Sequence, residues 1–100
     1  MDNWVMTTEA PCVHFGQIKD VQPSTTAGCE DCLRIGGRWV HLRLCMDCGH
    51  VGCCDSSPNR HATKHNHATE HPVVASFEPG EAWMYCYSDD LMLATQRSIR

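Results

Sequence analysis

Alternation of polar and apolar residues predicts a β-strand near the middle of the chain. Residues 38–44 follow a Gly-Gly turn and alternate with a period of two. This period places Val40, Leu42 and Leu44 on one face of the strand and the residues between them on the other. We therefore expect the first face to be buried.

Two further extended segments are predicted towards the C-terminal end. Residues 73–77 form a short apolar run that ends at a Glu-Pro-Gly turn. Residues 82–87 alternate, and Trp83, Tyr85 and Tyr87 fall on the same face. This second segment is expected to present an aromatic surface.

One helix is predicted between these strands. Ser57 stands where an N-cap is expected, and Pro58 suits the first helical turn. Residues 60–70 can then wind into a helix until Pro72 ends it. Helix and antiparallel strands together indicate a small α+β fold with a twisted antiparallel sheet and one or two helices.

The length of 100 residues fits one domain. We place that domain at residues 12–93, between an N-terminal tail (1–11) and a C-terminal tail (94–100). Residues 17–28 are rich in turn-forming residues and are expected to form a loop. After Asp90 the pattern is weak and allows a final strand or one helical turn.

Composition shows that apolar burial alone is too small to hold this fold. Leu, Ile, Val and Phe account for 17 of 100 residues, below the roughly 20% under which chains usually stay disordered. Eight cysteines and seven histidines are present. These residues are potential metal ligands, so bound metal is the expected source of the missing stability.

Charge and hydropathy argue against nucleic acid and membranes as partners. The net charge of −4 argues against nucleic-acid binding, which requires a basic patch. No apolar run reaches the length of a signal peptide or a membrane span. We therefore expect a cytoplasmic protein without membrane contact, in a reducing compartment where thiols bind metal rather than form disulfides.

Spacing turns the cysteines and histidines into candidate zinc ligands. Two residues between paired thiols allow both sulfurs to reach one tetrahedral ion. The candidates, in chain order, are Cys12, His14, Cys29, Cys32, Cys45, Cys48, Cys53, His61, His65, His71 and Cys86.

Other interpretations of these residues are weaker. Buried apolar cysteines with surface histidines would leave a core too poor to order so many positions without metal. A disulfide framework would leave the seven histidines unexplained. A redox dithiol would require a strand-helix-strand pattern that is missing here. His61 and His65 are spaced as in a zinc protease, but the glutamate that would act as the general base is absent between them.

In this series of ligands the sequence resembles the UBP-type zinc finger, the zinc finger of ubiquitin-specific proteases. The resemblance extends from Cys12 to about Leu93 and includes Trp39 and Trp83, which precede ligand cysteines. It implies three zinc ions in cross-braced sites. The implied ligands are Cys29, Cys32, Cys53 and His61 for one ion, and Cys45, Cys48, His65 and His71 for another.

The resemblance implies Cys12, His14 and Cys86 for the third ion. Many relatives supply a cysteine as the fourth ligand, where this chain has Asp89. A carboxylate is an acceptable zinc ligand, so we expect Asp89 there, with Asp90 or water as alternatives.

Four candidate residues are left over by this assignment. They are His41, His50, Cys54 and His67. His67 is an alternative to His65, but helical phase favours His65, one turn after His61. We expect Cys54 to be a packed or exposed thiol, His41 and His50 to be polar strand and loop residues, and His67 to lie on the helix surface.

The family also suggests a binding role. Members that bind ubiquitin hold its carboxyl tail with an arginine and a tyrosine shortly after the cysteine equivalent to Cys53. This chain has Asp55 and Ser56 in that stretch, and an aspartate repels a carboxylate. We therefore expect ubiquitin to bind weakly at most.

We interpret the chain as a non-catalytic module that binds an unidentified protein or peptide through aromatic side chains. The candidate contact residues are Trp39, Trp83, Tyr85 and Tyr87. Filling of the core around the zinc sites is the alternative role for these rings. A hydrolase that uses the Cys12/His14/Cys86 site, or a redox or zinc sensor based on Cys54, are the alternative functions.

Overall fold

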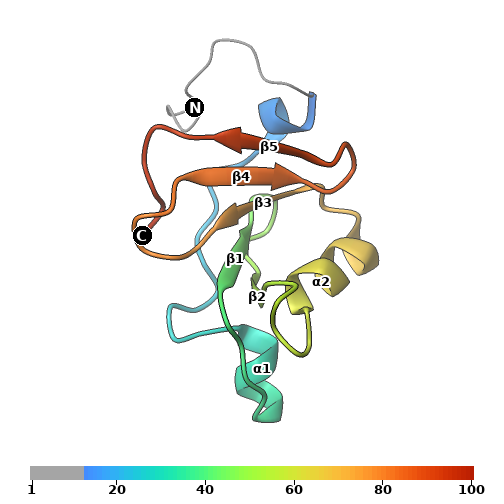
Figure 1. The fold of residues 1–100 in the computed structure, drawn as a ribbon. Coiled ribbons are helices and arrows are strands. Elements are labelled where there is room, and N and C mark those ends of the chain that lie inside the picture. The colour runs from blue at the N-terminus through green and yellow to red at the C-terminus, as the bar shows by residue number, and fades with distance from the viewer. Residues whose placement is uncertain (1–12) are drawn as a thin grey trace.

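A computed structural model of the chain describes residues 13–100, and its backbone forms an α+β fold (Figure 1). The helical elements are the 3₁₀ turn η1 (Val13–Gln17) and the helices α1 (Glu30–Ile35) and α2 (His61–Thr69). The strands are β1 (Leu42–Cys45), β2 (Val51–Cys53), β3 (Val73–Ser76), β4 (Trp83–Cys86) and β5 (Leu91–Ala94). The expected fold class is confirmed.

The five strands form one sheet in the order β2-β1-β3-β4-β5, and every neighbouring pair is antiparallel. In Figure 1, β4 and β5 lie at one end of the molecule and α1 at the other, with α2 beside β1 and β2. The ends of β1, β2 and β4 carry cysteines. This topology therefore brings Cys45 and Cys53 close to histidines of α2, whereas Cys86 lies beside His14 of η1.

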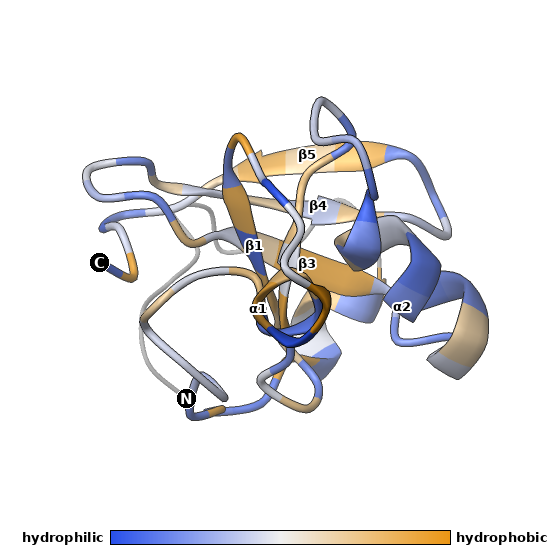
Figure 2. Ribbon diagram, turned by 90° about the horizontal axis from the view of Figure 1, so that it is seen from below, coloured by the Kyte–Doolittle hydropathy of each residue, from blue (hydrophilic) through white to orange (hydrophobic). Residues whose placement is uncertain are grey.

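The apolar core lies along the sheet. Phe15, Leu44, Phe77 and Met84 are each 1% exposed and belong to one buried cluster. All four residues of β3 are buried because this strand is central and is paired on both sides. Hydrophobic residues are concentrated in the strands, whereas α2 is mainly hydrophilic (Figure 2).

The strand predicted over residues 38–44 is shorter and shifted in the structure. Strand β1 starts at Leu42, and both Leu42 and Leu44 are buried as expected. Val40 precedes the strand and is 51% exposed, so its assignment to the buried face is wrong. The backbone N–H of Val40 donates a hydrogen bond to the Ser57 hydroxyl instead of joining the sheet.

The N-terminus of α2 also differs from the prediction. The helix begins at His61, and its N-cap is Arg60, in the left-handed conformation (φ 48°). Ser57 is not the cap: its side chain is buried and meets the backbone of Val40. Tertiary contacts therefore use the serine that was expected to start the helix.

Four elements were not specified by the sequence pattern. The 3₁₀ turn η1, helix α1 and strand β2 were not predicted, and the segment after Asp90 contains the strand β5. The loop predicted over residues 17–28 is confirmed over residues 18–28, which lack helix and strand, whereas Gln17 is the last residue of η1. No helix within residues 13–100 is long and apolar enough to cross a membrane.

Candidate metal centres and an aromatic pocket

The first cluster combines three buried thiols with one imidazole. Its members are Cys29, Cys32, Cys53 and His61. The Nδ1 atom of His61 lies 3.3 to 3.6 Å from the three sulfur atoms, and two of the sulfurs are 4.0 Å apart. A tetrahedral zinc ion with Zn–S bonds of about 2.3 Å has S–S edges of about 3.8 Å. The cluster therefore matches zinc in both spacing and donor chemistry.

Local backbone geometry presents these ligand atoms. Cys29 is the N-cap of α1, and its sulfur accepts a hydrogen bond from the backbone N–H of Cys32 (3.4 Å). Cys53 ends β2, and its sulfur accepts a hydrogen bond from the backbone N–H of His61 (3.1 Å). A helix start, a strand end and a second helix start thus converge on one point.

The second cluster has two thiols and two imidazoles. Its members are Cys45, Cys48, His65 and His71. The Cys45 sulfur lies 3.4 Å from Nδ1 of His71, and the Cys48 sulfur lies 3.3 Å from Nε2 of His65. The four ligand atoms lie within 4.8 Å of one another. This is again a donor set that suits tetrahedral zinc.

The two clusters are interleaved along the chain. His61 and His65 lie one turn apart on α2 but belong to different clusters. The second Cys-x-x-Cys pair, Cys45 and Cys48, lies in the sequence between the two halves of the first cluster. The last two residues of the first cluster in turn lie between the two halves of the second. The helix is therefore tied to both cysteine pairs.

A third group contains His14, Cys86 and Asp89. Nδ1 of His14 lies 3.0 Å from the Asp89 carboxylate and 3.4 Å from the Cys86 sulfur. Cys12 lies outside the described residues. Asp90, the alternative to Asp89, instead accepts a hydrogen bond from the Tyr85 hydroxyl (2.5 Å).

Burial changes the protonation of the ligand thiols. It raises the pKa of Cys29 to about 12 and that of Cys45 to about 11, because a buried thiolate loses its hydration. Burial, together with the neighbouring imidazoles of His50 and His71, lowers the pKa of His65. These groups therefore favour their neutral forms, and a bound cation would have to displace the thiol protons.

Comparison with known proteins places this geometry in a family. Residues 29–98 match the family described as the zinc finger in ubiquitin hydrolases and other proteins. The chain belongs to this zinc-finger family. The family and the Cys/His clusters together identify it as a zinc-binding module.

A solved structure resembles this zinc finger closely. It is the solution NMR structure of the protein RPA1320 from Rhodopseudomonas palustris. The sequences are 52% identical, the TM-score is 0.78, and the match covers 86% of this chain and 83% of that chain. No curated protein matches the chain.

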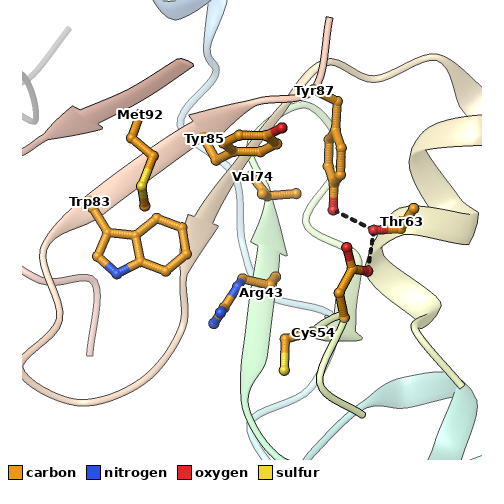
Figure 3. Close-up of a pocket in the computed structure, with 9 residues that line it drawn as sticks. Arg43, Cys54, Thr63, Val74, Trp83, Tyr85, Tyr87 and Met92 are labelled. Carbon is orange, nitrogen blue, oxygen red and sulfur yellow. Dashed lines mark hydrogen bonds between the residues drawn. The ribbon is translucent and has the colours of Figure 1, made fainter. Parts of the chain in front are cut away.

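The zinc finger also carries a pocket of about 290 Å³ beside the sheet. Figure 3 shows Trp83 and Tyr87 on opposite sides of this pocket, with Tyr85 and Val74 between them. The Tyr85 and Tyr87 rings meet edge to face, with centroids 5.2 Å apart. The predicted aromatic face of residues 82–87 thus lines a concave site, which we call the aromatic pocket.

Opposite charges line this aromatic pocket. The Arg43 guanidinium stacks 4.6 Å from the centre of the Trp83 ring and donates a hydrogen bond to the Leu42 carbonyl (3.0 Å). The Asp55 carboxylate accepts a hydrogen bond from the Thr63 hydroxyl (2.6 Å). The sequence placed Asp55 near the binding region, whereas Arg43 was recognised only as a strand residue.

Trp39 lies apart from the other three aromatic candidates. Its ring packs against the core and over Gly28, where an added Cβ would lie 2.3 Å from the indole. Gly28 also has a positive φ of 155°. The close approach explains why a glycine stands before Cys29.

The four leftover residues have different environments. Cys54 is 6% exposed and lines the aromatic pocket. Its burial opposes ionisation, but hydrogen bonds from Ser57 and from the backbone lower the pKa of its thiol to about 7. His41 and His67 are exposed. His50 packs against the second cluster, a role that its position in the sequence did not indicate.

Proposed function

We propose that this zinc finger is a non-catalytic protein-interaction module held together by structural zinc ions. The observation that carries the proposal is the separation of two features. Two Cys/His clusters beside α2 each contain the four donor residues that a tetrahedral ion needs. The aromatic pocket is a separate, open site. Closed donor sets suit structural zinc, and an open aromatic pocket suits a ligand.

We propose that the residues of each cluster are the ligands of one zinc ion. Cys29, Cys32, Cys53 and His61 would hold one ion, and Cys45, Cys48, His65 and His71 would hold a second. His14, Cys86 and Asp89 would hold a third with Cys12 as the fourth ligand. We infer three structural ions from these sets.

A hydrolytic function is less well supported. A catalytic zinc site keeps a coordination position open for water. The proximity of Asp89 to His14 and Cys86 supports a carboxylate at the position where water would otherwise bind. With Cys12, the third site would then be closed as well.

The aromatic pocket supports a protein or peptide ligand. Trp83, Tyr85 and Tyr87 offer large apolar area and hydroxyl groups, a composition that is common in protein-binding sites. Asp55 disfavours a terminal carboxylate, because its own negative charge lines the pocket. We therefore propose a ligand other than the free tail of ubiquitin.

A peptide-display selection on the immobilised, zinc-loaded chain tests this function. Peptides that are enriched should bind with an affinity that falls at least tenfold in Trp83→Ala and Tyr85→Ala. Val40→Ala is the matched control, since Val40 is an exposed apolar residue outside the pocket. Equal binding by wild type and the two pocket variants would overturn the proposed binding site.

A further inference from the structure

His50 occupies a position between the two four-residue clusters. It lies in the turn that connects β1 to β2, and its side chain is 11% exposed. Its ring stacks on the ring of His65, with centroids 4.0 Å apart and planes within 1° of parallel. Its Nε2 lies 2.7 Å from the Asp31 carboxylate. These two contacts fix the ring on one face and at one edge.

The stacking contact constrains a proposed zinc ligand. His65 directs Nε2 to the Cys48 sulfur (3.3 Å). A ligand histidine usually has its ring held by a hydrogen bond from its second nitrogen. Within residues 13–100, no hydrogen bond holds Nδ1 of His65, so ring contacts restrict the rotation of this ring. His50 covers its flat face at 4.0 Å, and His71 meets it edge to face at 5.4 Å.

The Asp31 contact leads to the other cluster. Asp31 lies on α1, between the ligand candidates Cys29 and Cys32. A metal that holds these two thiols would also hold the first turn of α1, and with it the Asp31 carboxylate. The contacts Asp31–His50–His65 therefore form a continuous connection from one cluster to the other.

We propose that His50 is a positioning residue for His65 and that Asp31 makes it a link between the two zinc sites. Metal in the Cys29 cluster would hold α1, Asp31 and His50, and so keep the His65 ring in its binding orientation. Because linkage between binding sites is reciprocal, metal in the Cys45 cluster would strengthen the Cys29 cluster equally. The inference rests on the proposed zinc ligands and is independent of the partner proposed for the aromatic pocket.

Cadmium-113 NMR of the full chain distinguishes the two sites. One cluster offers three thiolates and one imidazole, and the other offers two of each. Cadmium bound in them therefore gives separate resonances. Competition with a chelator, followed at each resonance, measures the affinity of each site. In His65→Ala the resonance of the Cys45 cluster should disappear if His65 is a ligand, and it should persist if His65 is not. This result tests the ligand assignment separately from the link.

The positioning role predicts a specific loss. In His50→Ala, affinity at the Cys45 cluster should fall ten- to a hundredfold, the usual effect of removing a residue that orients a metal ligand. His50→Phe keeps a flat ring without the nitrogen and should lose less. His67→Ala is the control, because His67 lies on the same helix, exposed and outside both clusters. A change below twofold in His50→Ala would overturn the proposal.

The role of Asp31 is tested by combining variants. Asp31→Ala should weaken the Cys45 cluster, and the double variant with His50→Ala should be no weaker than His50→Ala alone. Arg34→Ala, which removes the other ion-pair partner of Asp31, is the control and should leave the affinity unchanged. If the fold-losses in affinity of the two single variants multiplied in the double variant, Asp31 would not act through His50.

The link itself is visible in the order of filling. As cadmium is added, the resonances of the Cys29 and Cys45 clusters should grow in parallel in the wild type and one after the other in His50→Ala. Sequential filling in the wild type, or parallel filling in both proteins, would overturn the link. Each result at this step is independent of peptide binding.

Discussion

Side chains that are neighbours in the sequence can belong to different sites in this molecule. Cys53 and Cys54 are adjacent and both buried, yet only Cys53 lies in a cluster of ligand atoms. Cys54 turns to Ser57, 3.5 Å away, at the aromatic pocket. Alternation along an extended segment sends consecutive side chains to opposite faces, which explains the division.

This division predicts opposite results for adjacent substitutions. Cys53→Ser and His65→Ala should each lose at least one zinc equivalent, because each would remove one of four proposed ligands. Cys54→Ser and His67→Ala are the matched controls and should keep the full count. Native mass spectrometry measures the stoichiometry. If His67→Ala lost zinc while His65→Ala kept it, the helical phase assigned to α2 would be wrong.

The protonation of the thiols predicts how zinc binding depends on pH. Burial raises the pKa of the Cys29 and Cys45 thiols, so zinc must displace their protons. Each displaced proton costs about tenfold in apparent affinity for every pH unit below the thiol pKa. Zinc binding, and the stability that depends on it, should therefore be lost as the pH falls.

The two clusters should differ in this dependence. From pH 7 to pH 6.5, affinity should fall with a slope of about three decades per pH unit where three thiols bind, and about two decades where two bind. Chelator competition, corrected for protonation of the chelator, measures both slopes. Equal slopes at the two sites would contradict the assigned donor sets.

At the scale of elements, helix α2 shows why the fold is expected to depend on the Cys/His clusters. Of its nine residues, all of them described, only Ala62 is buried. A nine-residue helix is marginal in isolation, and this one lacks the broad apolar face that usually docks a helix. Its attachment instead comes from Ala62 against Gly52, and from His61 and His65 at the clusters.

The close approach of β2 and α2 predicts a sensitive position. A Cβ at Gly52 would lie 2.7 Å from the Ala62 backbone nitrogen and 2.8 Å from its Cα. Gly52→Ala should therefore push α2 away from Cys53, destabilise the fold by about 1–3 kcal/mol and weaken zinc binding. Chemical denaturation with zinc present measures the change.

Gly16→Ala is the control for this substitution, since an added Cβ there meets nothing within 4 Å. It should alter stability by less than about 0.5 kcal/mol. Equal stability of Gly52→Ala and Gly16→Ala would show that α2 tolerates displacement from β2.

Elements with a regular period were predictable, and those set by short-range or tertiary contacts were not. The alternation around Trp83 and Tyr85 identified β4, and Pro72 correctly limited α2. Strand β2 has only three residues, too few to show a period. The start of α2 was misplaced because Ser57 bonds to the backbone of Val40, a contact that local sequence does not reveal.

The candidate sites show the same limit. Cys-x-x-Cys spacing and the family resemblance indicated which residues the structure brings together, including the crossing of the two clusters. His50 and Arg43 were missed because their roles depend on which ring lies opposite after folding. No spacing rule encodes a stacking partner 15 or 40 residues away.

At the scale of the whole molecule, we expect bound metal and the apolar core to stabilise one another. The apolar core is small, with 17 Leu, Ile, Val and Phe residues in the entire chain. A structural zinc ion contributes on the order of 10 kcal/mol at neutral pH, whereas the net stability of a domain is only about 5–15 kcal/mol. We therefore expect the fold to depend on bound zinc.

Removal of metal should abolish the folded state. A strong chelator, with reductant present, is expected to collapse the dispersed amide resonances of the NMR spectrum, and added zinc should restore them. The reductant excludes disulfide formation as the cause. A dispersed spectrum from protein shown to hold no zinc would mean that the core suffices alone.

The arrangement of charges around the aromatic pocket predicts how the molecule responds to ubiquitin. Loss of one charged partner of a desolvated carboxylate typically costs about 2–5 kcal/mol, which corresponds to a loss of roughly thirty- to several-thousand-fold in affinity. Asp55 adds repulsion, and Arg43 is held on the Trp83 ring. We expect ubiquitin, or a peptide that ends in Gly-Gly, to bind with a Kd in the high micromolar range or weaker.

An NMR titration of the zinc-loaded chain with ubiquitin measures this affinity. Asp55→Arg is the informative variant, because it removes the repulsive carboxylate and places a guanidinium at the pocket; it should tighten binding at least tenfold. In Arg43→Ala the weak wild-type affinity should be nearly unchanged, because Asp55 repels the tail carboxylate whether or not Arg43 is present. Saturation of the wild type at low micromolar ubiquitin, abolished by Arg43→Ala, would instead show that Arg43 leaves the indole to hold the carboxylate tail.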